Sequence, residues 1–235
     1  MDFHSVLANR EARKERGARP YENFRENSDK CISAAKDLVS ETEKSRHVDL
    51  LERATIIAFV TYVEVYFRDM LDTIFKYCDP EFFLPQLKHI HNQKYDIEEV
   101  LEIFRLQIHP LELISSEYSF QNIDRIEKVF SKFLKKGLWS EAINLKVRVK
   151  DSLTIDPKMV VTFEPEYLKA LGRILSLRHE LVHNPRRSRP LNEAVLTDMK
   201  NADGIIFAAN IILENMLGEN QDPALKTENK QEQDG

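Results

Sequence analysis

The chain has 235 residues, of which 42% are hydrophobic and 31% are charged, and its formal net charge is −5. This length fits one large domain or two small ones, and it is ample for a sizeable core. Residues 218–235 account for three of the five negative charges, so the remaining chain carries only about −2. The balance excludes a general polyanion binder, and any contact with nucleic acid must come from a local patch.

Membrane-spanning and disulfide-stabilised classes are not expected. No stretch approaches the roughly 18 apolar residues needed to cross a bilayer, and the N-terminus has no apolar signal core. The two cysteines, Cys31 and Cys78, form neither a CxxC motif nor a disulfide framework. We therefore expect a cytoplasmic protein without contact with a membrane.

The first third of the chain is expected to be helical. Residues 3–43 are charged and weakly amphipathic, and they predict two helices separated around residues 17–20. Residues 47–78 predict the strongest helix of the chain, which ends at Asp79-Pro80. Between Ala54 and Phe67 this helix is apolar on nearly every side, as is typical of the central helix of a bundle.

The middle of the chain has a more broken pattern. Residues 80–136 predict shorter helices, of which 96–108 and 120–134 are the clearest. Residues 144–163 change to β-branched alternation, which favours a small hairpin or an irregular insertion. The chain is therefore expected to be interrupted by an insertion around residues 80–163.

The last part of the chain returns to helix. One helix is expected from Glu164-Pro165 to about Pro185, and another from about residue 191 to 217. Residues 218–235 are acidic and nearly free of apolar side chains, so we expect a disordered tail. The predicted fold class is all-α: one helical bundle over residues 1–217 with a small inserted hairpin or irregular segment.

One stretch on the penultimate helix, SLRHELVHNPRR (residues 176–187), carries candidate functional residues. At 100° per residue, Arg178 falls in the middle of the apolar face. A guanidinium stays charged, so burying it without a partner is costly. Either the face opens into a polar cleft at Arg178, or a carboxylate lies opposite. Glu64, one turn before Arg68 on the central helix, is the candidate carboxylate.

His183 stands near the predicted end of the same helix. It is four residues from His179, so the two imidazoles share a face. Pro185 disfavours helical geometry at the preceding residue and lacks a backbone N–H. We therefore expect the helix to end beside His183, which can turn towards the cleft.

The hexapeptide Arg178-His179-Glu180-Leu181-Val182-His183 resembles the Arg-polar-x-x-x-His signature of the HEPN superfamily. The segment AFVTYVEVYFRDML (residues 58–71) is similar to the long second helix of the RiboL-PSP type of HEPN protein. The likeness covers the bundle helices, about half of the chain, and leaves residues 80–163 and the tail without a counterpart. It implies a metal-independent endoribonuclease of the toxin or anti-phage type, acting as a homodimer whose two motifs face each other.

The resemblance also implies roles for individual residues. His183 would be the acid/base, and Arg178 would bind the phosphate and stabilise transition-state charge. His179 and Glu180 would orient or support these groups, with Glu64 as a further supporting residue. RNA is the expected substrate, with no metal and no cofactor, and an antitoxin or regulatory protein is a possible partner. A related HEPN class carries a tyrosine where this chain has Pro185, so nucleotide modification there is not expected.

Plainer interpretations stay open for each feature. Arg178 could pair with Glu64 structurally, leaving a non-catalytic helical module that binds RNA, a nucleotide or a protein partner. Glu64 and Arg68 could be an ordinary i, i+4 pair. The cluster Arg186, Arg187 and Arg189 could contact RNA phosphates or form a solvated loop. Outside this stretch, His89 and His91 are expected to be surface histidines rather than metal ligands.

Overall fold

The computed structural model describes residues 3–16, 19–40, 47–90, 94–148, 160–184 and 190–223. In these ranges the helices are α1 (Phe3–Arg16), α2 (Pro20–Ser40), α3 (Val48–Tyr77), α4 (Pro80–Ile90), α5 (Ile97–Arg105), α6 (Pro110–Glu117), α7 (Ile123–Phe130), α8 (Leu138–Ala142), α9 (Pro165–His183) and α10 (Glu193–Glu219). The strands β1 (Lys146–Arg148) and β2 (Val160–Thr162) pair antiparallel, with Val147 opposite Val161. The all-α prediction and the small hairpin are both confirmed.

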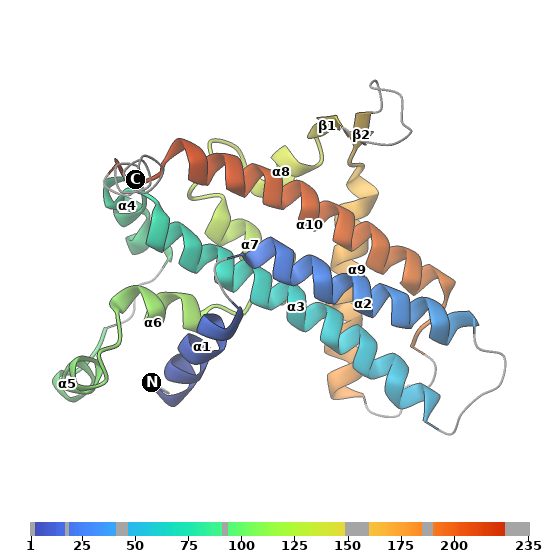
Figure 1. The fold of residues 1–235 in the computed structure, drawn as a ribbon, viewed down its shortest axis with the longest axis horizontal. Helices are drawn as coiled ribbons and strands as arrows, with labels where there is room; N and C mark the ends of the chain where they lie inside the picture. The colour runs from blue at the N-terminus through green and yellow to red at the C-terminus, as the bar shows by residue number, and fades with distance from the viewer. Residues whose placement is uncertain are drawn as a thin grey trace, which may run out of the picture.

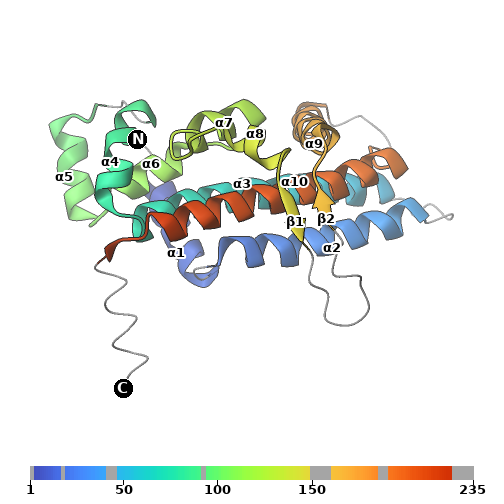
Figure 2. The ribbon, with the colours of Figure 1, turned by 90° about the horizontal axis from the view of Figure 1, so that it is seen from above.

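The long helices form a layered bundle (Figure 1). Helices α2, α3 and α10 run side by side along the length of the molecule, while α9 crosses them steeply. Seen from above, α7, α8 and α9 lie on the opposite side of the α3–α10 layer from α2 (Figure 2). The layers are also tied by polar contacts, since the Ser28 hydroxyl of α2 donates to the Asp203 carboxylate of α10.

Helix α3 is the centre of the core, as its pattern predicts. Phe59, Val63 and Phe67 on this helix are fully buried. The ring of Phe67 packs against three aromatic rings from the middle of the chain, namely Phe120, Phe130 and Trp139. The middle region is therefore packed into the main core through these aromatic side chains.

Two local features place α9 in the bundle. Pro165 starts the helix at a position where a backbone N–H has no helical partner. On α10, a Cβ added to Gly204 would lie 2.9 Å from the Tyr167 ring of α9, so glycine permits the two helices to approach closely. At the other end, the backbone N–H of Asn184 donates to the Glu180 carbonyl at 2.7 Å, closing the last turn before Pro185.

The predicted boundaries in the middle of the chain are too long. Helix α5 ends at Arg105, where the sequence predicts helix to Ile108, because Gln107 has a left-handed φ of 51° that turns the chain. Ile108 is buried after the turn, in a small separate core with Val6 and Leu113. Helix α7 is likewise only Ile123–Phe130.

The chain beyond residue 217 is also more structured than expected at its start. Helix α10 continues to Glu219, and Gln221 forms a β-bridge with Cys78. The backbone N–H of Asp79 donates to the Asn220 carbonyl at 2.9 Å, which fastens the end of α10 to the end of α3. The rest of the predicted tail, residues 224–235, lies outside the described residues.

None of the described helices is both long enough and apolar enough to cross a membrane.

Candidate active site

The side chain of Arg178 is held by a neutral partner. Its Nη1 donates to the Gln121 amide oxygen at 3.0 Å, and this is the only hydrogen bond of the guanidinium within the described residues. Its Nε is buried and has no hydrogen-bond partner there. No carboxylate in the described part of the chain forms an ion pair with Arg178. The positive charge is thus partly buried without being neutralised, a costly arrangement unless a ligand uses it.

Arg178 faces a cleft of about 760 Å³ between α9 and the segment that leads into α7. Its polar lining comes from both walls: Ser119, Gln121, Asn122, Asp124 and Arg125 on one, and Ser176, Arg178, His179 and Glu180 on the other. The sequence predicts either a polar cleft or an opposing carboxylate at Arg178. The structure has the cleft.

Close packing below the cleft brings its walls together. A Cβ added to Gly172 of α9 would lie 3.0 Å from the Ile123 side chain of α7, so a larger residue would push the walls apart. The Trp139 indole N–H donates to the Ile123 carbonyl at 3.2 Å, which fixes the start of α7. Gly172 therefore allows a residue 57 positions earlier in the chain, Gln121, to reach Arg178.

The two histidines of the motif are adjacent at the end of α9. The ring centroids of His179 and His183 are 4.5 Å apart and the rings are tilted by 55°. His179 lines the cleft with Arg178, while His183 is exposed and is not among the lining residues. Helix α9 includes His183 as its last residue, and this side chain is not turned into the cleft, as the sequence predicts it would be. The Asn184 carbonyl accepts from Arg53 of α3 at 3.2 Å, which anchors the helix end. Arg178 and His179 thus line the cleft together, and the His183 ring contacts the His179 ring.

Glu64 has a different place from the one considered in the sequence analysis. It is half-buried on α3 and forms no hydrogen bond or ion pair with Arg178, or with any other residue that the structure describes. Arg68, one turn later, does not pair with Glu64 either, and its Nε is buried without a partner in the same ranges. The partner of Arg178 is Gln121, and Glu64 is not brought to the cleft lining.

Some predicted site residues fall outside the described ranges. Arg186, Arg187 and Arg189 are among them. His91 and the side chain of His89, which were expected to be surface histidines, also lie outside the described residues. Glu180 is described, and it lines the cleft beside His179. Within the described residues, no group of three or more His, Cys, Asp or Glu side chains is arranged to hold a metal ion.

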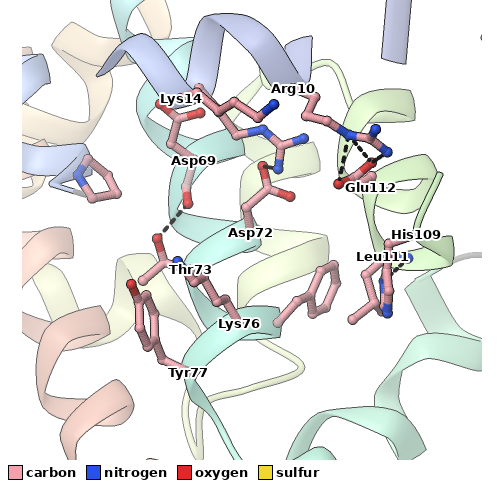
Figure 3. Close-up of a pocket in the computed structure, with 13 residues that line it drawn as sticks. Arg10, Lys14, Asp69, Asp72, Thr73, Lys76, Tyr77, His109, Leu111 and Glu112 are labelled. Atoms are coloured by element: carbon pink, nitrogen blue, oxygen red, sulfur yellow. Dashed lines mark hydrogen bonds and ion pairs between the residues drawn. The ribbon is translucent and has the colours of Figure 1, made fainter. Parts of the chain in front are cut away.

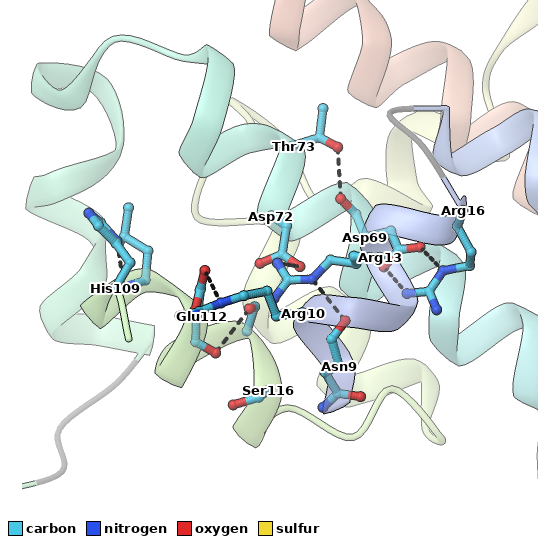
Figure 4. A network of polar contacts seen from close by, with 12 residues as sticks. Asn9, Arg10, Arg13, Arg16, Asp69, Asp72, Thr73, His109, Glu112 and Ser116 are labelled. Atoms are coloured by element: carbon cyan, nitrogen blue, oxygen red, sulfur yellow. Dashed lines mark hydrogen bonds and ion pairs between the residues drawn. The ribbon is translucent and has the colours of Figure 1, made fainter. Parts of the chain in front are cut away.

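A second cavity, of about 560 Å³, lies far from the motif, between α1, α3 and α6 (Figure 3). The arginines and carboxylates of its lining take part in three arginine–carboxylate pairs, which we call the arginine clasp; the third arginine of the clasp lies outside the lining. Arg10 pairs with Glu112, Arg13 with Asp72, and Arg16 with Asp69 (Figure 4). The pair of Arg16 and Asp69 is bidentate, with N–O distances of 2.8 and 2.7 Å.

The arginine clasp attaches helix α1 to α3 and α6, which is a structural role. The carboxylates of Asp69 and Asp72 stand on the inner helix α3, and burial raises the pKa of Asp72 to about 6. Helix α1 buries only Val6, so ion pairs carry much of its attachment to α3 and α6. Because the arginines are already paired, this cavity offers less unused charge than the α9 cleft does.

Comparison with protein families matches residues 23–212 to RiboL-PSP-HEPN, which is most of the chain. The chain belongs to the RiboL-PSP-HEPN family. The HEPN match begins inside α2 and ends inside α10, so it contains α9 and its motif but not α1. It also runs through residues 80–163, which the sequence resemblance left without a counterpart. Searches of curated proteins and of solved structures found no match to the chain.

Gln121 is the site residue that the sequence analysis missed. It lies between α6 and α7, where no periodicity marks a facing side chain, and an isolated glutamine carries no motif. The one signal in the sequence was Arg178 itself, because an arginine on an apolar face demands a polar partner. In this chain, the partner comes from the segment between α6 and α7.

Proposed function

We propose that the chain is a metal-independent endoribonuclease of the toxin or anti-phage type. Its HEPN fold supports this, since HEPN domains are often nucleases. The observation that carries the proposal is the Arg178 guanidinium, which is partly buried and bonded only to a neutral amide among the described residues. His179 lines the same cleft, and the His183 ring contacts the His179 ring. Such a cation is available to a phosphate, which an arginine can bind bidentately.

The chemistry follows from these groups. The 2′-oxygen of RNA attacks the adjacent phosphorus while His183, as base, takes the 2′-hydroxyl proton. The bond from phosphorus to the 5′-oxygen breaks, and the leaving oxygen receives a proton from a second acid. Arg178 stabilises the negative charge on the crowded phosphorane. The products are a 2′,3′-cyclic phosphate and a 5′-hydroxyl, and DNA is spared because it lacks the nucleophile.

In this proposal, the second copy of the chain in a homodimer supplies the second proton-transfer group. A two-fold axis beside the end of α9 would bring a second His183 and a second Arg178 to one phosphate. The exposed apolar side chains Leu50, Leu51 and Val182 support an interface here. They lie on the ends of α3 and α9, which the bond from Arg53 to Asn184 joins. His179 or Glu180, both of which line the cleft, is the alternative within one chain.

The decisive assay mixes the pure protein with single-stranded RNA in EDTA. We expect cleavage, cyclic phosphate ends, no action on DNA of the same sequence, and loss of activity by roughly 10²- to 10⁴-fold in His183→Ala, the range for removal of an acid/base group. Activity that disappears in EDTA and returns with Mg²⁺ would overturn the mechanism. So would a His183→Ala protein that cuts at the wild-type rate.

The dimer has its own test. Mass from light scattering and specific activity are measured together over a dilution series. We expect specific activity to fall as the dimer dissociates. A stable monomer with undiminished specific activity would rule out the shared cleft and assign the second group to His179 or Glu180.

A non-catalytic HEPN module that binds RNA, a nucleotide or a protein partner is the second candidate. The exposed position of His183, outside the cleft lining, favours it. It predicts RNA binding without cleavage in the same EDTA assay. Under either function, an antitoxin or regulatory protein that covers the end of α9 is a proposed partner.

A further inference from the structure

We infer that residues 119–125 form the substrate-facing wall of the cleft, and that Gln121 is a positioning residue which holds Arg178 for an RNA phosphate without neutralising it. The inference rests on the proposed function, because it concerns the same cleft. It assigns a substrate-binding role to part of the middle region and names a residue outside the motif.

The hydrogen-bond partner of Arg178 is uncharged. An arginine has five N–H donors, and Arg178 uses one of them on Gln121 within the described residues. A glutamine oxygen fixes the direction of the guanidinium through a hydrogen bond but carries no charge. A carboxylate at this position would hold the arginine more strongly and would compete with the phosphate. Gln121 therefore orients the cation and leaves its charge for the ligand.

The residues on both sides of Gln121 are held firmly in place. Phe120 is fully buried and packs against Phe67 and Phe130. On the other side of Gln121, the Asn122 side chain accepts from the backbone N–H of Asp124 at 2.7 Å and caps α7. With the Ile123 carbonyl bound by Trp139, Gln121 is held between fixed neighbours. Its bond to Arg178 is thus preorganised, as a group that positions a catalytic cation should be.

Charged side chains of both signs line the cleft. Arg125 is exposed at the cleft and forms no ion pair with any described residue. Two carboxylates, Asp124 and Glu180, also line the cleft, and both are exposed to solvent, which screens them. Arg125 is exposed and screened in the same way, so the partly buried Arg178 is the least screened charge of the cleft, and Arg125 offers a weaker second contact for a phosphate. A cleft with two cations on opposite walls suits the backbone of a single RNA strand.

The test replaces Gln121 with glutamate, which keeps the shape and the acceptor but adds the charge. We expect the melting temperature to stay equal or rise, while the KM for RNA rises roughly 10- to 100-fold, the scale of a hydrogen bond to a charged group. Gln121→Met, which removes the acceptor without adding charge, should lower kcat more than it changes KM. Gln86→Glu on α4 is the matched control and should cleave as the wild type does.

The outcomes separate this inference from the proposed function. If the wild type cleaves RNA and Arg178→Ala does not, wild-type kinetics in Gln121→Glu would overturn the positioning role alone. If the wild type does not cleave RNA, the proposed function fails, and binding decides the inference. The probe is then an uncleavable 2′-deoxy oligonucleotide followed by fluorescence anisotropy: weaker binding by Gln121→Glu supports the role of Gln121, and unchanged binding overturns it.

Discussion

The arginines at the two ends of this molecule have opposite electrostatic surroundings. In the arginine clasp, Arg10, Arg13 and Arg16 each meet a carboxylate. In the α9 cleft, Arg178 meets a glutamine, and its Nε has no partner in the described structure. The same side chain thus fastens a helix in one region and stays available in the other. The charge of the partner distinguishes the two sites, and it is at Arg178 that we propose a ligand-binding role. Arg68, whose Nε also has no partner in the described structure, is not part of the cleft lining.

The largest effect is expected when the arginine of the cleft is removed. Arg178→Ala should lower RNA cleavage by about 10²- to 10³-fold, the usual loss when a group that stabilises transition-state charge is removed. Arg173 is the matched control on the same helix, because it is exposed and paired with Asp198 and Glu166. Arg173→Ala should retain wild-type cleavage in the same initial-rate assay. Equal losses in the two variants would mean that α9 requires both arginines for folding.

The next effect concerns the stability of the clasp. Arg16→Ala leaves the Asp69 side chain, which is only 8% exposed, without its cation. We expect it to lower the free energy of unfolding by roughly 2 kcal/mol, between the values for exposed and buried pairs. Asp69→Asn should cost less, because Arg16 is 28% exposed and can be solvated. Urea unfolding measures both variants. Lost cleavage with unchanged stability in Arg16→Ala would give the clasp a functional role.

A smaller, pH-dependent effect should arise from Asp72. Burial raises its pKa in the folded protein from 3.8 to about 6, although Arg13 opposes the shift and Asp69 and Glu112 add to it. The folded state therefore binds the proton more tightly than the unfolded state does. The stability contribution of this proton is full below about pH 4 and is lost as pH rises through about 6, with a slope of up to about 1 kcal/mol per pH unit.

The check is urea unfolding of the wild type and Asp72→Asn between pH 4 and 7. The wild type should lose stability relative to the variant as pH rises across this range. A relative gain would show that the pair with Arg13 outweighs burial. The pH profile of RNA cleavage, which belongs to the cleft, should be the same in both proteins.

The smallest effect is expected from the cluster Arg186, Arg187 and Arg189, which follows the motif in the sequence. Replacing all three with glutamine should weaken RNA binding without changing the cleavage step. Each phosphate contact that is lost should reduce the slope of log K against log salt by about 0.7. Binding titrations at several salt concentrations measure this. An unchanged slope would assign the cluster to a solvated loop.

The helices of the bundle could be predicted from the sequence because their signals are local. Proline at residues 20, 80 and 165 marks helix starts, and the apolar surroundings of Phe59 and Val63 mark α3 as central. The boundaries of α5 and α7 failed for a physical reason. Ile108 continues the apolar spacing of α5, yet it turns away to pack against Val6, more than 100 residues earlier.

Only part of the candidate site could be predicted from the sequence in the same way. His179 and His183 are four residues apart on one helix, so their spacing shows that they are neighbours, and Arg178 is marked by its place on the apolar face. Gln121 and the clasp depend on contacts between distant parts of the chain, such as Arg16 with Asp69 and Arg178 with Gln121. Periodicity cannot report which charged or amide side chains meet across such separations. Glu64 was the nearest carboxylate by helix pattern, but the fold brings an amide instead.

The contact between Ser28 and Asp203 has a consequence for how the chain is made. Helices α2 and α10 are neighbours in the bundle, yet these residues are 175 positions apart. At about 5–20 residues per second, the ribosome needs roughly 9–35 s to add the second partner after the first. Until α10 emerges, the aromatic face of α2 and α3 has no cover, and α9 lacks the helix against which it packs. A nascent chain therefore cannot assemble the bundle before almost all of it has been translated.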